Sequence, residues 1–555
     1  MPDPRRNAAI WYATDAFDPD KKGLNGRRVA GESFLRGFLK YVDADCIQGL
    51  VGGVGAGREF KSVVSDHLQG RRLETYYLYE RRNHPKVRNV FYPSPNYGTE
   101  AWRRFHFGQK TYTITGITHT TATKGVMNGI FDLLASPVEP WDGLICTSTS
   151  VLQHMQYQFD LFAEYAARKF GAAPKTVPQL AKIPLGIHTE DFQPTPADRA
   201  ALRDELDIGD DDVAFMVLSR LSAHEKFDPL PVYRALALAQ RDTGKTVHMI
   251  LCGYFPDTVS EGVFRDGAKS AMPNVKLHVV DGKNAAKRMQ AFGAADVFLF
   301  PIDNIQETFG IAPIEAMAAG LPVIGSDWDG LKDTISPDVG FRVPTHMPGP
   351  ALLQDESYRY QNDHDKYMHY TLLTASMTQL DVPYMAKCMA RLIKNPNLRR
   401  KMGDAGRVRA KQHYDWSVVI PQMQDFWADL DDRRISAESS LNKKYHGMDV
   451  PPSPNVARLF KSYPTHQGGL NDIALSPGAG ATADALDYAL KNRNFEKMGR
   501  VVEHNNTMHA VLAEYLKQGA GATVRSVAAA LGKSLNPVAR CTYFFLKYDL
   551  LQKMD

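Results

Sequence analysis

The stretch that decides the fold is ETFGIAPIEAMAAGLPVIGSDWDG, residues 307–330. It follows the apolar run VFLFP (297–301), which is typical of a buried strand, and it contains a helical pattern from about Pro313 to Ala319 that ends at Gly320. The next apolar run, LPVIGS (321–326), predicts another strand. Strand, turn, helix and strand in this order predict a nucleotide-binding α/β domain.

Two carboxylates eight positions apart, Glu307 and Glu315, belong to this turn and its helix. Glu307 follows the strand, and Phe309 and Gly310 bring backbone amides to the helix start, which is a favourable place for an anion. Glu315 is expected in the first helical turn, where it can accept hydrogen bonds from ribose hydroxyls. The segment, with Thr308 between these groups, predicts a site for sugar, diphosphate and ribose.

The segment resembles the signature of retaining GT-B glycosyltransferases, the family 4 type (glycosyl transferases group 1). In that family the first glutamate contacts the donor sugar and the second the ribose, which gives these roles to Glu307 and Glu315. The resemblance covers roughly residues 8–430 and implies an α/β fold with two Rossmann-like domains, whose parallel sheets face each other across a cleft. It also implies a UDP- or GDP-sugar donor and no further cofactor.

Two cations, Arg220 and Lys226, follow the predicted strand VAFMVL (213–218). Arginine supplies a planar fork and lysine a mobile point charge, so a pair six positions apart can clamp a diphosphate from two sides. Their RL…EK placement also matches the family. The pair Asp327 and Asp329 has the D-x-D spacing of a metal site, but in this fold cations and a helix N-terminus neutralise the diphosphate, so no metal is expected.

His119 ends the alternating segment TYTITGITHTTAT (111–123). In the resembled family a histidine follows a strand of the first domain and points across at the donor sugar, and His119 takes that place. The alternative is a loop histidine that is hydrogen-bonded locally. His119, Arg220, Lys226 and Glu307 are therefore the candidate catalytic residues.

A polar loop with glycines, DPDKKGLNGRR (18–28), joins the first predicted strand to an amphipathic helix. By resemblance, Gly23, Asn25 and Gly26 lie near the donor diphosphate or the acceptor, although ordinary βα turns look similar and Gly31 is a rival. Apolar runs at 247–254, 275–282 and 295–301 predict further parallel strands with right-handed crossovers. Tyr254 and the turn at 281–283 fall at carboxyl ends, where they are expected to border the nucleobase.

The composition is that of a globular protein: the chain has 555 residues, 44% hydrophobic and 23% charged, and its net charge of +4 identifies no partner. We find no apolar run long enough for a membrane span and no signal peptide, so a cytoplasmic location is expected. The five cysteines are scattered and odd in number, which predicts buried thiols rather than a disulfide framework or a zinc site.

We expect an acceptor-side domain over residues 1–185 and a nucleotide-sugar-binding domain over 186–430, whose last helix crosses back to the first. The stretch 345–378 is an insertion relative to the family; a surface loop is the simplest interpretation and an acceptor-side lid the alternative. Residues 431–485 predict a linker, and residues 486–555 a small all-α module.

The C-terminal module has the pattern of a helix-turn-helix, with Thr523 as an N-cap, Gly532 at a tight turn and Pro537 near the start of the last helix. From residue 491 on, the sequence has ten basic residues (Lys and Arg) and five acidic ones (Asp and Glu). This excess predicts DNA contact, with Arg525, Lys533 and Arg540 as candidates. The alternative is a module for dimerisation or docking.

The sequence thus predicts a retaining, metal-independent glycosyltransferase and leaves the acceptor open. A hydroxymethylated base in DNA is one candidate, which would have to leave the base stack. A lipid, glycan or small molecule is another, with the tail forming a homodimer. A third hypothesis is a DNA-binding protein that senses a nucleotide sugar without turning it over.

Overall fold

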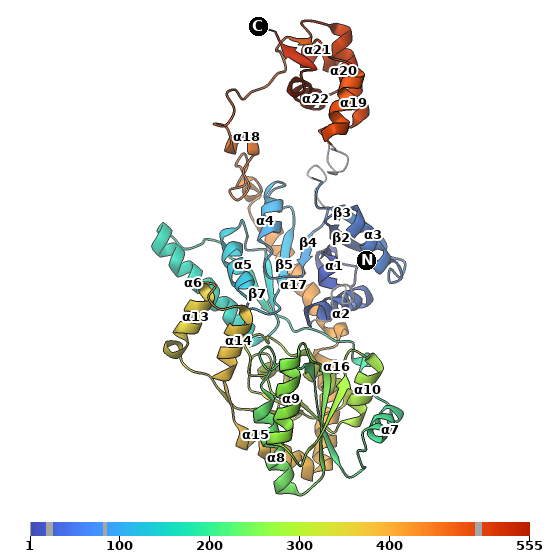
Figure 1. Ribbon diagram of the computed structural model, residues 1–555, viewed down its shortest axis with the longest axis vertical. Helices are drawn as coiled ribbons and strands as arrows, with labels where there is room; N and C mark the ends of the chain where they lie inside the picture. The colour runs from blue at the N-terminus through green and yellow to red at the C-terminus, as the bar shows by residue number, and fades with distance from the viewer. Residues whose placement is uncertain (1, 18–25, 81–85, 494–501, 555) are drawn as a thin grey trace. The chain divides into compact units, whose positions relative to one another are not determined.

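The computed structural model describes residues 2–17, 26–80, 86–493 and 502–554. The chain divides into two units, residues 1–448 and 449–555, and each is described on its own (Figure 1). The first unit contains two parallel sheets. The predicted domain boundaries at 185, 430 and 485 lie inside these units and stay predictions.

The N-terminal sheet has seven strands in the order β3-β2-β1-β4-β5-β6-β7. All of its neighbours pair in parallel, as the expected crossovers require. The strands are β1 (Ala8–Tyr12), β2 (Cys46–Val51), β3 (Arg72–Tyr77), β4 (Asn89–Tyr92), β5 (Thr113–Ile117), β6 (Gly143–Cys146) and β7 (Gln179–Lys182). The accompanying helices are α1 (Thr14–Phe17), α2 (Gly26–Tyr41), α3 (Val54–Ser65), α4 (Gly98–Phe105), α5 (Lys124–Ala135) and α6 (Thr149–Phe170).

The second sheet has six parallel strands in the order β10-β9-β8-β11-β12-β13. The order reverses next to β8, as in a doubly wound fold, and this confirms the predicted α/β architecture. The strands are β8 (Val213–Arg220), β9 (Val247–Tyr254), β10 (Lys276–Asp281), β11 (Val297–Phe300), β12 (Val323–Ser326) and β13 (Gly340–Val343). The helices are α7 (Pro196–Glu205), α8 (Pro229–Thr243), α9 (Thr258–Ala271), α10 (Ala285–Ala294), α11 (Ile311–Ala319), α12 (Leu331–Thr334), α15 (Val382–Lys394) and α16 (Pro396–His413).

The insertion between β13 and α15 is helical, and the interpretation as a simple surface loop is wrong. A short pair of strands, β14 (Thr345–His346) and β15 (Gln379–Leu380), closes its base. Between them lie a 3-10 turn (Pro350–Leu353) and the helices α13 (Gln354–Gln361) and α14 (Tyr367–Ser376). The two helices pack through stacked rings of Tyr360 and Tyr370, whose centroids are 4.3 Å apart.

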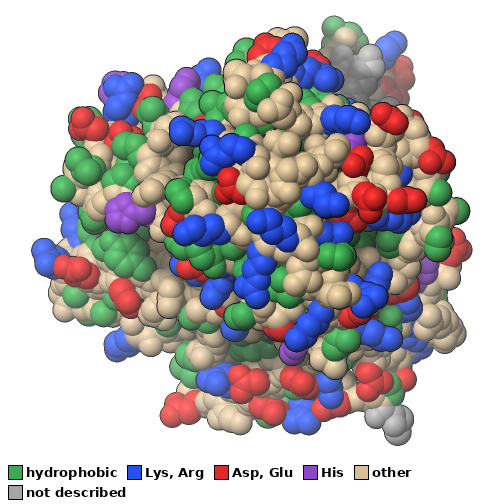
Figure 2. All heavy atoms as spheres, turned by 90° about the horizontal axis from the view of Figure 1, so that it is seen from below, with side chains coloured by type: hydrophobic (Ala, Val, Ile, Leu, Met, Phe, Trp, Pro, Cys, Tyr) green, Lys and Arg blue, Asp and Glu red, His purple; other side chains and the backbone are tan. Residues whose placement is uncertain are grey.

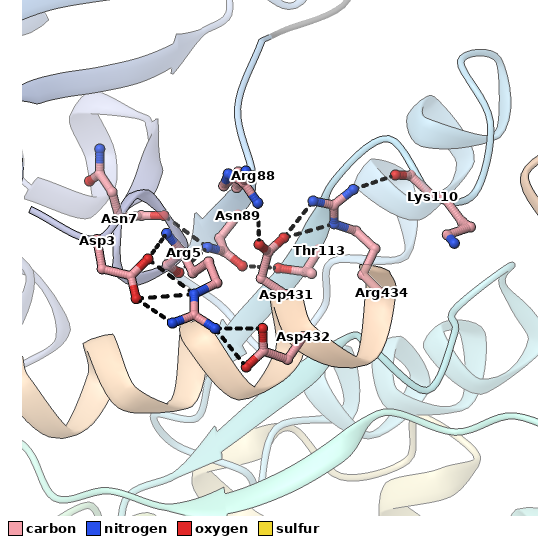
Figure 3. Close-up of polar contacts among 10 residues, drawn as sticks. All are labelled: Asp3, Arg5, Asn7, Arg88, Asn89, Lys110, Thr113, Asp431, Asp432 and Arg434. Atoms are coloured by element: carbon pink, nitrogen blue, oxygen red, sulfur yellow. Dashed lines mark hydrogen bonds and ion pairs between the residues drawn. The ribbon is translucent and has the colours of Figure 1, made fainter. Parts of the chain in front are cut away.

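Helix α17 (Trp416–Ser436) contacts the first domain near both of its ends. Near its start the buried Trp416 donates its Nε1 hydrogen to Ser33 Oγ on α2 at 2.9 Å. Near its end the fully buried Asp431 accepts from Arg88 at 2.7 Å and from Arg434 (Figure 3). Because α17 is held at both ends by the first domain, it fastens the second domain to it.

The second unit combines helices with a short β ribbon. It contains α18 (Val456–Leu459), α19 (Ala483–Arg493), α20 (Asn505–Gln518), α21 (Val524–Ala530) and α22 (Leu535–Lys547), together with β16 (Leu475–Pro477) and β17 (Leu551–Lys553). The two strands pair antiparallel, which the sequence did not indicate. Thr523 caps α21 through a capping box, and Gly532 has a φ of 58° in the turn before α22.

The five cysteines are buried free thiols, as predicted. Burial raises the pKa of Cys146, Cys252 and Cys541 to about 12. None of the described helices combines the length and apolar character needed to cross a membrane. On the face that Figure 2 shows, acidic and basic side chains are interspersed.

Candidate active site

The signature segment forms the turn between β11 and α11. Gly310 precedes the helix with a φ of 78°, a conformation that favours glycine. The helix begins at Ile311, two residues earlier than predicted, so Glu315 lies in its second turn and not in its first. Gly330 presses against this turn, because a Cβ on it would lie 2.6 Å from the Phe309 Cα. The loop after β12 therefore supports the signature turn directly.

Glu307 binds the amides at the helix start. Its Oε1 accepts from Gly310 N at 3.2 Å and from Thr308 N at 3.4 Å. Its Oε2 accepts from Lys226 Nζ at 3.0 Å. Burial raises the pKa of Glu307, but Lys226 and the two amides outweigh it and hold that pKa below its ordinary value. The structure thus joins two predicted site residues that lie 81 positions apart in the chain.

Arg220 ends β8 and forms an ion pair with Glu225 at 2.5 Å, with its side chain 29% exposed. Arg220 also stands opposite Tyr254 in the pairing of β8 with β9. The ammonium of Lys283 lies over the Tyr254 ring, 4.6 Å from its centroid. These contacts bring the predicted diphosphate residues and the predicted nucleobase residues to the same edge of the sheet.

Glu315 is partly buried on α11. Burial raises its pKa to about 7, and Arg288 opposes the shift without cancelling it. The carboxyl group is therefore divided between its neutral and ionised forms near neutral pH. Both forms can bond a ribose hydroxyl, but only the ionised form is purely an acceptor.

His119 lies in the loop after β5 and is partly buried. The next residue, Thr120, donates its hydroxyl to the Gln306 carbonyl at 2.9 Å. The loop that carries His119 therefore contacts the residue directly before the signature segment of the other domain.

Three residues after β6 make similar contacts across the two domains. Ser148 Oγ donates to the Thr308 carbonyl at 2.9 Å and Ser150 Oγ to the Asp329 carbonyl at 3.2 Å. At the start of α6, Thr149 N and Oγ1 donate to the two oxygens of Asp333 at 2.6 and 2.9 Å. Sequence reasoning missed this set. The signal available was a run of hydroxyl residues directly after a buried strand, at helix-capping positions.

The partners in these contacts all follow strands at their carboxyl ends: β5 and β6 on one side, β11 and β12 on the other. The carboxyl edges of the two sheets therefore face each other, which is the GT-B arrangement that the sequence predicts. Ligands of open parallel sheets bind at such edges.

Two further carboxyl groups near the signature turn were not predicted as site residues. Asp303 is 2% exposed, and burial raises its pKa to about 8, although its Oδ2 accepts from Asp228 N at 3.3 Å. Asp329 has a left-handed φ of 44°. Burial, with Glu307 and Asp333 nearby, raises its pKa well above the ordinary value. Asp327 instead forms an ion pair with Arg342 at 3.3 Å.

Of the predicted glycine loop, Gly23 and Asn25 lie outside the described residues, and Gly26 begins α2. In the C-terminal module, Arg525 pairs with Asp472 at 2.7 Å and Arg540 with Glu503 at 2.9 Å. Lys533 is exposed in the turn between α21 and α22.

Comparison with known proteins gives a family for part of the chain: residues 198–351 match the model "Glycosyl transferases group 1". A GDP-mannose-dependent monoacylated alpha-(1-6)-phosphatidylinositol monomannoside mannosyltransferase of Corynebacterium glutamicum is 23% identical over 46% of this chain and 58% of the relative. A D-inositol 3-phosphate glycosyltransferase of Saccharomonospora viridis is 28% identical over 34% of this chain and 43% of the relative. The matches thus span about half the length of these curated relatives.

Among solved structures, Anabaena Alr3699/HepE in complex with UDP and glucose covers 76% of this chain and 100% of its own. Its sequence is 13% identical and the TM-score is 0.48.

Proposed function

We propose that this chain, which carries a glycosyl transferases group 1 domain over residues 198–351, transfers a sugar from a nucleotide-diphosphate sugar to an acceptor hydroxyl with retention and without a metal. The observation that carries the proposal is the ion pair between Lys226 and Glu307, which joins the cation loop after β8 to the signature turn. A sugar placed at Glu307 would have its diphosphate beside Lys226.

The roles follow from charge and position. Arg220 and Lys226 neutralise the departing diphosphate, Glu307 orients sugar hydroxyls, and His119 faces the sugar from the first domain. The amide of Gly310 already donates to Glu307, so the stabilising charge in this proposal comes from Arg220 and Lys226. Catalysis then consists of positioning and of stabilising charge on the leaving group. Glu315 holds the ribose.

For the acceptor we propose a hydroxyl of a lipid, glycan or small polyol. Support comes from the relatives, one of which is named for a phosphatidylinositol mannoside acceptor and another for inositol 3-phosphate. The donor of the first is GDP-mannose, and we extend that donor class to this chain. A hydroxymethylated DNA base has weaker support, because Arg525 and Arg540 are already engaged in ion pairs.

The test is release of nucleoside diphosphate from GDP-mannose and from UDP-glucose, with inositol phosphate, phosphatidylinositol vesicles or hydroxymethylated DNA as acceptor. We expect Arg220→Ala or Lys226→Ala to lower kcat/KM by about 100-fold or more. The control is Arg241→Ala; the Arg241 side chain is 72% exposed and pairs with the neighbouring Asp242. Near-normal kcat/KM in both site variants would sink the assignment. Turnover that depends on hydroxymethylated DNA would replace the proposed acceptor.

A further inference from the structure

The helical insertion touches both Rossmann-like domains. On one side, the Tyr360 hydroxyl accepts from Lys124 N at 2.7 Å, and Lys124 Nζ pairs with Asp363 at 2.6 Å, at the start of α5 in the first domain. On the other side, Thr371 Oγ1 donates to the His224 carbonyl at 3.1 Å. His224 lies between Arg220 and Lys226 in the sequence, so the insertion contacts the loop that carries the proposed diphosphate residues.

The insertion is held in one conformation by its own side chains. Arg359 binds both oxygens of Asp365 at 2.9 Å, which fixes the turn between α13 and α14. The rings of Tyr360 and Tyr370 lie nearly parallel, at an interplanar angle of 6°, and Tyr360 is 7% exposed. A side chain carried by α14 is therefore well placed in advance of ligand binding.

Tyr367, the first residue of α14, carries a buried hydroxyl that has no hydrogen-bond partner of ordinary geometry among the described residues. Burial raises its pKa to about 12; Thr120 and Arg220 lower it, and Glu225 raises it. The phenol therefore lies near Thr120, the residue after His119, and near the Arg220–Glu225 ion pair. It keeps its proton at neutral pH. A buried hydroxyl without a partner is costly, and an incoming acceptor atom would remove that cost.

We propose that Tyr367 is a donor-binding residue whose O–H bonds a diphosphate oxygen of the nucleotide sugar beside Arg220. The inference rests on the proposed function, because it takes Arg220 as a diphosphate residue. Diphosphate oxygens are acceptors only, so they complement a phenol that donates. Glu225 neutralises Arg220 in this structure, and the bound diphosphate exchanges with that carboxylate.

The experiment compares two variants on the same helix in the full chain. Tyr367→Phe removes one oxygen, and Tyr370→Phe is the matched control, since its ring stays stacked on Tyr360. Isothermal titration gives Kd for GDP and UDP and for guanosine and uridine, and thermal melting gives Tm. For the nucleotide that wild type binds, we expect Tyr367→Phe to weaken binding of the diphosphate about 10- to 100-fold and to leave binding of the nucleoside unchanged. Tm should stay the same or rise, because the variant loses a buried hydroxyl that has no partner in the free protein. Tyr370→Phe is expected to change none of these.

Unchanged diphosphate affinity in Tyr367→Phe would overturn the inference while leaving the proposed function intact. An equal loss of affinity for nucleoside and diphosphate, together with a lower Tm, would also overturn the inference, because that combination indicates a structural role. Wild-type protein that binds neither GDP nor UDP would overturn the proposed function and the inference together.

Discussion

Glu315 makes ribose binding dependent on pH. Its pKa of about 7 follows from burial, and ribose hydroxyls bond best to the ionised carboxylate. We therefore expect nucleoside affinity to rise by up to about 10-fold between pH 6 and pH 8, as the ionised fraction grows. Titration calorimetry with guanosine or uridine measures this without a titrating phosphate.

The control is Glu315→Gln, whose affinity should not vary with pH in this range. The raised pKa of Glu315 also makes the stability of the fold depend on pH. Because the folded pKa lies above the unfolded value of about 4.3, the free energy of unfolding should fall as pH rises from about 4.3 to 7. An equal pH slope of nucleoside binding in wild type and Glu315→Gln would contradict the assigned role.

At the residue scale, the sequence predicts which side chains belong together but not how they are bonded. Arg220, Lys226 and Glu307 could be selected because their charges suit a diphosphate and a sugar and because their placement resembles the family pattern. The direct bond between Lys226 and Glu307 depends on the pairing of β8 with β11, which spacing alone does not specify. Asp303 and Tyr367 could not be selected, since their significance comes from burial, which depends on the tertiary fold.

At the scale of elements, the packing of α17 on α2 depends on two glycines. A Cβ on Gly37 would lie 2.4 Å from Trp416 Cγ, and one on Gly186 would lie 2.5 Å from Trp416 Cδ2. We expect Gly37→Ala to lower the free energy of unfolding by about 1–3 kcal/mol through overpacking. Urea denaturation checks this.

The matched control for that substitution is Gly55→Ala in α3, where a Cβ would have no neighbour within 4 Å among the residues that the structure describes. There the removal of backbone freedom should stabilise the helix by about 0.5–1 kcal/mol. If both alanine variants were stabilising, the ring of Trp416 would not fill the space beside Gly37 as described.

Elements with a clear apolar run were predictable, including the parallel strands around β8, and the crossing helix α17 was expected from the resemblance to the family. The insertion was not, because α13 is mostly polar and the apolar residues of α14 do not gather on one face. Its helices are held by tertiary contacts, among them the Tyr360–Tyr370 stack and the Arg359–Asp365 ion pair. β17 was missed for a similar reason: three residues near the chain end carry no periodic signal, and they form a strand only because β16 pairs with them.

At the scale of the whole molecule, the two units have separate hydrophobic cores. The core of the second unit is built from its own residues, among them the buried Leu512, Tyr515 and Phe545. We expect calorimetry of the full chain to show two unfolding transitions. Leu512→Ala should lower the free energy of unfolding of the second unit by about 2–5 kcal/mol, and with it the midpoint temperature of one transition. A bound nucleoside diphosphate should raise only the midpoint temperature of the other transition. A single transition that both changes shift together would contradict separate cores.

The five native cysteines are buried, so thiol reagents should label an introduced cysteine and leave the native ones unmodified. Maleimides and related reagents attack the exposed thiolate, and burial denies them both exposure and ionisation at these positions. Two introduced cysteines, one at an exposed position of α6 and one at an exposed position of α9, could therefore carry a pair of fluorophores without removal of the native cysteines. Energy transfer between the two dyes would then measure, in single molecules, whether the distance between the two Rossmann-like domains changes when a nucleotide sugar binds.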